Sequence, residues 1–204
     1  MAALNFYGTT SLPGLFGFDQ NGLIQGEYQP HPSARFSISG AYVGTDVTVP
    51  VYGGMQITEF TPATDDLMGN SGGGKVEVAA TQAAATGFVV SSQMYNAVNV
   101  AGPLGANAAP YVAAGNSVQI ARFGSGLPIA VAIDPAAVAA LQGGAVNQQV
   151  SWDATKQRLV AYSGTLGAVP VEIIRIEANS KVIAVDATSG IPVWQDGPAA
   201  LIRL

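Results

Sequence analysis

Short runs of β-branched and aromatic residues, separated by Gly, Pro, Asn and Asp, recur from Arg35 to the end of the chain. This pattern is typical of β strands bounded by turns. The runs that we interpret as strands are Phe36–Val43, Val47–Tyr52, Met55–Phe60, Lys75–Ala80, Gly87–Ser92, Ser117–Arg122, Ile129–Ile133, Gln148–Asp153, Arg158–Tyr162, Val171–Glu177, Lys181–Val185 and Ile191–Trp194. Many short strands at close spacing predict an all-β fold, an antiparallel sandwich or barrel, with a jelly roll among the arrangements that fit.

Two pairs of these runs predict β-hairpins. The first joins residues 150–152 to 159–161 across a polar turn of four residues. The second joins residues 174–176 to 182–184 across a turn at 178–180. We therefore expect each pair to form adjacent antiparallel strands.

One short helix is expected near residues 135–142. Asp134 is a suitable N-cap, and Pro135 follows it at the first helical position. Gly143 or Gly144 supplies the left-handed residue that ends such a helix. Because the segment is barely two turns long, tertiary packing has to hold it.

The first 34 residues differ from the rest because they are rich in Gly and aromatic residues and keep no regular period. We interpret residues 1–34 as an extended N-terminal arm and residues 35–204 as a β-rich domain. If that domain consists of two subdomains, the glycine-rich stretch 63–74 is the expected joint. Deletion of residues 1–28 is expected to leave the β domain folded.

Aromatic side chains in the arm are the candidate partner-binding residues, since aromatic groups bury a large area at little cost in rotamer entropy. Packing back onto the chain's own core and insertion into a neighbouring chain are both open for them. The candidates are Phe6, Tyr7, Phe16, Phe18 and Tyr28.

Composition narrows the function classes. Only 10% of the residues are charged, against about 25% in an ordinary soluble domain, so most of the surface is neutral and suited to cover by other protein. The net charge of −5 with eight Lys and Arg residues argues against a nucleic-acid partner. No basic n-region precedes Arg35 and no uninterrupted apolar stretch is long enough to span a bilayer, so neither a signal peptide nor membrane insertion is expected.

Glycine-rich residues 69–75 carry two weak resemblances to catalytic motifs. Gly69 to Lys75 matches part of a phosphate-binding loop, but Val76 stands where a hydroxyl should bind Mg²⁺. Ser71 lies in a G-x-S-x-G pattern like that of a nucleophilic serine, and His31 is the one histidine that could activate it. A flexible loop is the favoured interpretation of both.

The remaining candidate chemistry is less specific. Asp65 with Asp66, and Glu172 with Glu177, are carboxylate pairs of the kind any acidic chain contains. With one histidine and no cysteine, only oxygen ligands are available for a metal, so a surface calcium site stays open. We predict no catalytic residues, no cofactor and no dedicated metal site, and we expect that the protein is not an enzyme.

The segment from Ser117 to Leu159 carries a resemblance to a known family. Its motifs are residues 119–126 (QIARFGSG), 129–135 (IAVAIDP), 143–153 (GGAVNQQVSWD) and 157–159 (QRL). They resemble the structural cement, or capsid decoration, proteins of tailed bacteriophages, most clearly between Gly87 and Tyr162. The resemblance implies a homo-oligomer, a dimer or trimer, that is assembled onto the outer surface of the head in the host cytoplasm. There it would hold major capsid protein subunits together against the pressure of packaged DNA.

Two alternatives belong to other classes. A carbohydrate-binding surface module of a virion, similar to a lectin or adhesin, would use Trp152 and Trp194 as stacking platforms, although a tryptophan in a strand is more often part of the core. A serine hydrolase, the weaker alternative, would depend on Ser71.

Overall fold

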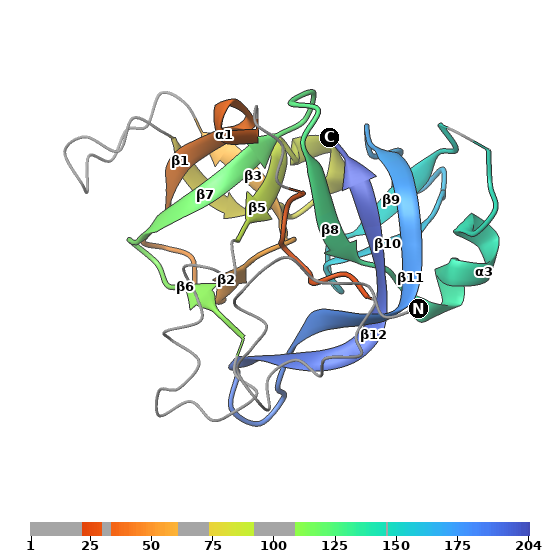
Figure 1. The fold of residues 1–204 in the computed structure, drawn as a ribbon. Coiled ribbons are helices and arrows are strands. Elements are labelled where there is room, and N and C mark those ends of the chain that lie inside the picture. Colours follow the sequence, from red (N-terminus) through yellow and green to blue (C-terminus); the bar gives the residue numbers. More distant parts are fainter. Residues whose placement is uncertain (1–21, 30–33, 61–73, 92–108, 146) are drawn as a thin grey trace.

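The structure is a computed structural model, and it describes residues 22–29, 34–60, 74–91, 109–145 and 147–204 (Figure 1). The fold is all-β, as the sequence predicts. Its strands are β1 (Ile38–Val43), β2 (Val51–Tyr52), β3 (Gln56–Phe60), β4 (Lys75–Val78), β5 (Gly87–Val90), β6 (Tyr111–Val112), β7 (Ser117–Arg122), β8 (Pro128–Ala132), β9 (Val150–Asp153), β10 (Arg158–Ala161), β11 (Glu172–Val185) and β12 (Pro192–Arg203). The helical turns are α1 (Ala34–Ser37), η1 (Gln82–Ala84), η2 (Pro135–Ala137) and α3 (Val138–Leu141).

Five strands from the first part of the described chain close into a barrel in the order β1-β4-β3-β5-β7. All neighbours in the barrel are antiparallel except β1 and β4, which run parallel. Closure leaves no free edge in this sheet. Strands β3 and β4 pair with each other, so the stretch 63–74, most of which lies outside the described residues, connects two neighbouring strands of one barrel.

The later strands form a second layer beside the barrel (Figure 1). Strands β11, β12 and β8 make a three-stranded antiparallel sheet, and β9 pairs with β10. The first predicted hairpin is confirmed, with Leu159 opposite Trp152. A bridge between Ile133 and Leu159 connects this hairpin to the residue that follows β8.

The second predicted hairpin is wrong. Residues 174–176 and 182–184 belong to one 14-residue strand, β11, and both halves pair with β12. The register shifts between Glu177 and Ser180, so the residues interpreted as a turn form an irregularity within the strand. Opposite Ser180 lies Gly197, followed by Pro198, and these residue types are tolerated in a strand at such irregular positions.

The predicted short helix is present as η2 followed directly by α3. The Asp134 carboxylate accepts a hydrogen bond from the Ala136 backbone N–H at 3.0 Å, so it acts as the expected N-cap. Gly143 has a φ of +76°, the left-handed conformation predicted for the end of the helix. The first turn is a 3₁₀ turn, a common variation at helix ends.

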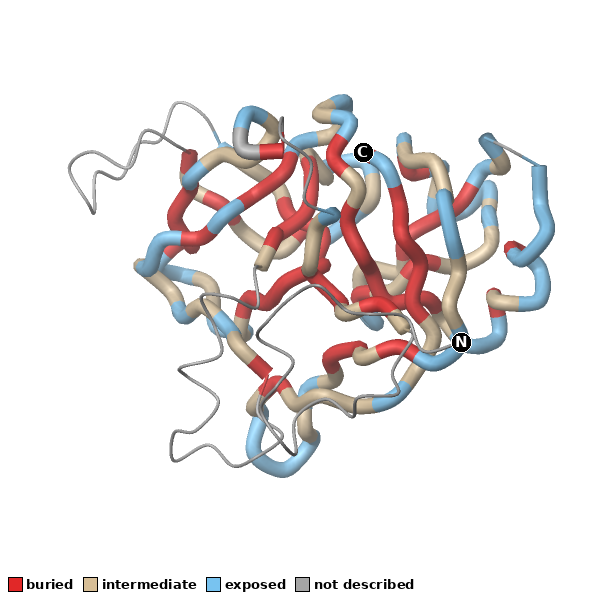
Figure 2. The backbone as a smooth tube through the Cα atoms, viewed as in Figure 1, coloured by how far each residue is buried: buried red, intermediate tan, exposed pale blue. Residues whose placement is uncertain are grey.

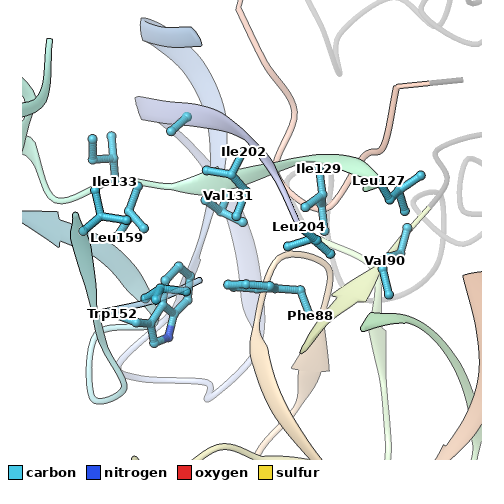
Figure 3. Packing of buried hydrophobic residues seen from close by; sticks show 14 of the residues in the cluster. Phe88, Val90, Leu127, Ile129, Val131, Ile133, Trp152, Leu159, Ile202 and Leu204 are labelled. Atoms are coloured by element: carbon cyan, nitrogen blue, oxygen red, sulfur yellow. The ribbon is translucent and has the colours of Figure 1, made fainter. Parts of the chain in front are cut away.

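A large apolar cluster joins the barrel to the second layer, and the buried strands of both lie side by side (Figure 2). Phe88 enters it from barrel strand β5, and Trp152 enters it from β9 (Figure 3). Their rings meet edge to face, with centroids 5.0 Å apart and an interplanar angle of 79°. Because Ile129 of β8 and Ile202 of β12 belong to the same cluster, the barrel and the sheet share one core.

Residues 22–29 are built in between the barrel and the sheet, although they belong to the predicted arm. Gln25 is buried, and its backbone N–H donates to the Lys181 carbonyl at 2.9 Å. The side-chain nitrogen of Gln25 donates to the Gly53 carbonyl at 3.1 Å, and its side-chain oxygen accepts from the Ile183 N–H at 2.8 Å. One neutral amide thus connects the barrel loop at Gly53 to strand β11.

A pair of glutamines, Gln56 and Gln157, connects the barrel to the hairpin. The Gln56 backbone N–H donates to the side-chain oxygen of Gln157 at 3.1 Å. The side-chain nitrogen of Gln157 donates to the Ala154 carbonyl at 2.7 Å, inside the turn between β9 and β10. Gln157 has a φ of +51°, and these two hydrogen bonds hold it in that unusual conformation.

Gln25 generates a stability prediction. We expect Gln25→Ala to lower the free energy of unfolding by about 2–4 kcal/mol, because it leaves the buried Ile183 N–H and the Gly53 carbonyl without their partner. Urea unfolding followed by circular dichroism measures the change. The matched control is Gln29→Ala, an exposed position in the same segment, which should change the value by less than about 0.5 kcal/mol. Equal effects of the two substitutions would contradict the role given to Gln25.

Candidate functional site

A groove of about 440 Å³ lies between the barrel and the second layer. Four parts of the chain enclose it: the stretch from the end of the β1–β2 loop to Met55, the end of β4, the turn between β9 and β10 with the start of β10, and the end of β11. The residues that line it are Val49, Pro50, Tyr52, Met55, Val78, Ala154, Thr155, Lys156, Gln157, Arg158, Ile183, Ala184 and Val185. We call this hollow the Arg158 groove.

The floor of the Arg158 groove is part of the second apolar cluster. Tyr52, Met55 and Ile183 are buried and pack together there. On the rim, Val49 and Val185 are exposed to 49% and 46%, which is high for large apolar side chains. The groove therefore exposes an apolar surface to solvent at its rim.

Two cations line the groove, and they differ in their partners. Lys156 donates to the Asp134 carboxylate at 2.9 Å, so its charge is already paired. The Arg158 side chain is half-buried and makes no hydrogen bond or ion pair within the described part of the chain. Two carboxylates lie near it: Asp153 is its cross-strand neighbour on β9, and the pKa of Asp134 is lowered mainly by Lys156 and to a smaller extent by Arg158. Burial raises the pKa of the nearby Tyr52 phenol, and the charge of Arg158 partly offsets that rise. No Asp or Glu lies among the residues that line the groove.

A second, smaller hollow of about 150 Å³ lies between β2, β6 and the ends of β5 and β7. Its lining contains Tyr52 and Tyr111 but no charged residue. It therefore offers a ligand fewer distinguishing contacts than the Arg158 groove does.

The strongest ion pair of the described residues lies on the barrel wall. The Arg122 guanidinium donates two hydrogen bonds of 2.6 Å to the Glu59 carboxylate, and it donates a third, of 2.9 Å, to the Ser39 hydroxyl. The Glu59 side chain is only 5% exposed. Hydrogen bonds from Arg122 lower the pKa of Glu59, with a further contribution from the Gly74 N–H, so the carboxylate is ionised at neutral pH. This pair joins β3, β7 and β1 and has a structural role.

Several of the residues singled out in the sequence lie outside the described residues. These are Phe6, Tyr7, Phe16, Phe18, His31, Asp65, Asp66 and Ser71. Partner binding by the four aromatic residues stays a prediction.

Tyr28 is the one candidate partner-binding residue in the described part of the arm. It pairs with Ile129 through an antiparallel bridge, and its side chain is half-buried against the main apolar cluster. In this structure Tyr28 packs on its own chain, which is one of the two roles that the sequence leaves open.

The remaining candidate residues for catalysis or phosphate binding form ion pairs with neighbouring side chains. Lys75 begins strand β4 rather than a helix, and the hydrogen bonds that its ammonium donates to the carboxylates of Glu77 and Asp46 raise its pKa, so it is engaged on the barrel. Glu172 pairs with Arg203, and Glu177 pairs with Arg175, so these carboxylates do not form one site.

The two tryptophans pack in or against the apolar clusters. Trp152 is fully buried, and Trp194 is half-buried against the second apolar cluster. Trp152 therefore presents no platform to a sugar.

Metal-ligating side chains are scattered over the described ranges. Within these ranges, no group of three or more His, Cys, Asp or Glu side chains is placed to hold a metal ion. Among the helices of the same part of the chain, none is both long enough and apolar enough to cross a membrane.

Comparison with known proteins gives no relative. No family model, no curated protein and no solved structure matches the chain.

Sequence reasoning did not find the Arg158 groove. Val49, Arg158 and Val185 are far apart in the sequence, and each looks like an ordinary strand or loop residue. Arg158 appears there as the first residue of the predicted strand Arg158–Tyr162 and within the QRL motif of the family resemblance. The predicted hairpin places Asp153 opposite it, so nothing in the sequence showed that this arginine lines a groove.

The Glu59–Arg122 pair generates a pH prediction. Because the pKa of Glu59 is lowered in the folded state, the stability that it contributes is present above the pKa of a free glutamate, 4.5, and is lost as the pH falls through the lower folded value. At pH 7 we expect Glu59→Gln to lower the free energy of unfolding by about 1–3 kcal/mol, and the difference from wild type should shrink on acidification. Urea unfolding at a series of pH values measures this.

The control for that series is Glu172→Gln, which removes a carboxylate whose side chain is 32% exposed and paired with Arg203. An exposed pair of this kind should contribute less than about 1 kcal/mol. A Glu59→Gln effect that is independent of pH would contradict the assignment.

Proposed function

We propose that this protein is a virion structural protein that decorates the outside of a tailed-phage head and cements neighbouring major capsid protein subunits. In this role it acts mechanically and catalyses no reaction. The proposed partners are the major capsid protein and further copies of the chain itself, as a dimer or trimer. The proposed location is the outer surface of the capsid.

The observation that carries the proposal is a surface poor in charge and rich in exposed apolar side chains. The whole chain has eight basic and thirteen acidic residues. Large apolar side chains are nevertheless exposed on several elements of the described surface: Phe36, Val49, Phe60, Tyr111, Tyr162, Leu166, Ile174 and Val185. Apolar contacts spread over different elements suit a protein that is covered by several neighbours in a lattice, where many weak contacts act together.

The family resemblance is compatible with the same proposal. Its motifs lie on β7, β8, η2, β9 and β10 and on the turns between them, where barrel and second layer meet. Gly124 and Gly126 in the first motif have φ values of +80° and +70°, so these positions are turn signatures. Turn and packing motifs of this kind are shared between proteins of similar fold and do not identify an active site.

The direct test is binding to heads. Purified protein is incubated with expanded heads that lack it, and the mixture is sedimented at several salt concentrations. We expect saturable co-sedimentation that persists at high salt, since few charges are available to the contact. No co-sedimentation at any salt concentration would contradict the proposal, and glycan binding that is lost in Trp194→Ala would favour the carbohydrate-binding alternative.

The contribution of the arm is tested separately. The truncation ends at residue 21, because the buried hydrogen bonds of Gln25 make a deletion of 1–28 unsuitable. We expect the shortened protein to keep its unfolding midpoint and to bind heads at least about tenfold more weakly. The matched variant keeps the full length and carries Phe6→Ser, Tyr7→Ser, Phe16→Ser and Phe18→Ser. Undiminished binding by both variants would show that these four aromatic residues are not partner-binding residues.

A further inference from the structure

Strand β11 has unpaired backbone groups where it borders the Arg158 groove. At Lys181, the outer edge of β11 is occupied: its N–H donates to the Leu23 carbonyl at 2.8 Å, and its carbonyl accepts from Gln25. Two residues further, the Ile183 N–H donates to the Gln25 side chain. Alternate residues of a strand face the same edge, so the N–H and carbonyl of Val185 also point outward. Within the described residues, neither group meets a partner at this edge.

The open edge begins where segment 22–29 turns away from β11. Gly26 has a φ of +86°, and its N–H donates to the Ala130 carbonyl on β8. A side chain at this position would place its Cβ 2.5 Å from the Gly53 Cα, so glycine is required for the turn. The chain's own segment therefore covers β11 as far as Ile183 and leaves Val185 uncovered.

The side chains around this edge define what it could accept. The apolar floor and the exposed rim residues Val49 and Val185 suit apolar side chains at alternate positions of an extended chain. The lining carries Lys156 and Arg158 and no acidic residue, in a chain whose net charge is −5. Asp134 pairs with Lys156, and Asp153 accepts from the backbone N–H groups of Thr155 and Lys156, so neither carboxylate is hydrogen-bonded to Arg158. A carboxylate of a partner is therefore the group that Arg158 would pair with most favourably.

We propose that the Arg158 groove docks an extended peptide segment of a partner protein. The segment adds a short strand to β11 at Val185, places apolar side chains over the floor at Met55, and pairs one Asp or Glu side chain with Arg158. Strand addition supplies affinity through the backbone, and the guanidinium and apolar surfaces supply specificity. This inference goes beyond the proposed function and does not depend on it.

The other open stretch of β11 is less suited to such a partner. Its first half carries Arg175 and Glu177, which pair with each other, and the register shifts between Ile173 and Arg175. Charged side chains and irregular register on an edge discourage strand addition. At Val185 the register is regular and the edge lies against an apolar groove, while the charged residue that follows, Asp186, accepts hydrogen bonds from the backbone of Thr188 and Ser189 within its own turn.

The experiment measures peptide binding to the full chain by fluorescence anisotropy. The probe is a labelled peptide, acetylated and amidated, with the sequence Thr-Val-Thr-Glu-Thr-Val-Thr, which places two valines and one glutamate on the same face. Two further peptides carry Gln or Lys at the central position. We expect saturable binding of the Glu peptide, at least about fivefold tighter than the Gln peptide, and the weakest binding for the Lys peptide.

Variants locate the binding. Arg158→Gln should lower the affinity for the Glu peptide to that of the Gln peptide. Val185→Pro removes the outward N–H and should lower the affinity for both peptides. Arg175→Gln makes the same charge change at the other end of β11 and should leave binding unaltered. Circular dichroism checks that each variant keeps its fold. Independently of any variant, the Val185 amide resonance of the wild-type protein should shift on titration with the Glu peptide.

Several results would overturn the proposal. These are absence of saturable binding, equal affinity for the three peptides, an unmoved Val185 amide resonance, or equal losses in Arg158→Gln and Arg175→Gln. Self-association that disappears in Arg158→Gln, without peptide binding, would assign the groove to a second copy of the chain instead. Because no heads are present, each of these results leaves the proposed binding to heads standing.

Discussion

The arrangement of barrel and second layer depends on buried hydrogen bonds from neutral amides. Gln25 holds the Gly53 loop of the barrel and strand β11 with a single side chain, and Gln157 holds the start of β3 with the turn of the β9–β10 hairpin. In this chain with few charges, these amides make the polar contacts between layers that ion pairs often make in other proteins. A neutral amide is less costly to bury than an ion, provided that its donor and acceptor groups are satisfied.

The same amides fix the geometry of the Arg158 groove. Gln25 sets the position of Ile183 at one wall, and Gln157 is itself part of the opposite wall. The shared core around Phe88 and Trp152 then prevents the two layers from sliding relative to each other (Figure 3). Structural stability and the candidate binding surface therefore have one origin, and a substitution that loosens these contacts is expected to affect both.

Local patterns in the sequence were sufficient for most of the fold. Strand β7 has the predicted bounds, and the helix starts at Asp134 and stops near Gly143 as its capping residues indicate. Prediction failed where tertiary pairing overrides a local signal: Ala178 to Ser180 resembles a turn, but β12 pairs with both sides of it. The groove escaped prediction for a related reason, since its two walls come from segments far apart in the sequence that meet only where the second layer packs against the barrel.

The proposed role requires that the chain occupy the outside of a shell and span the contacts between its subunits. The most direct measurement is a difference map between images of expanded phage heads with and without the bound protein, obtained by cryo-electron microscopy. We expect additional density on the outer surface, placed over the junctions between major capsid protein subunits and large enough for the barrel and its second layer. Density confined to the inside of the head, or no density at all at saturating protein, would contradict the proposed role.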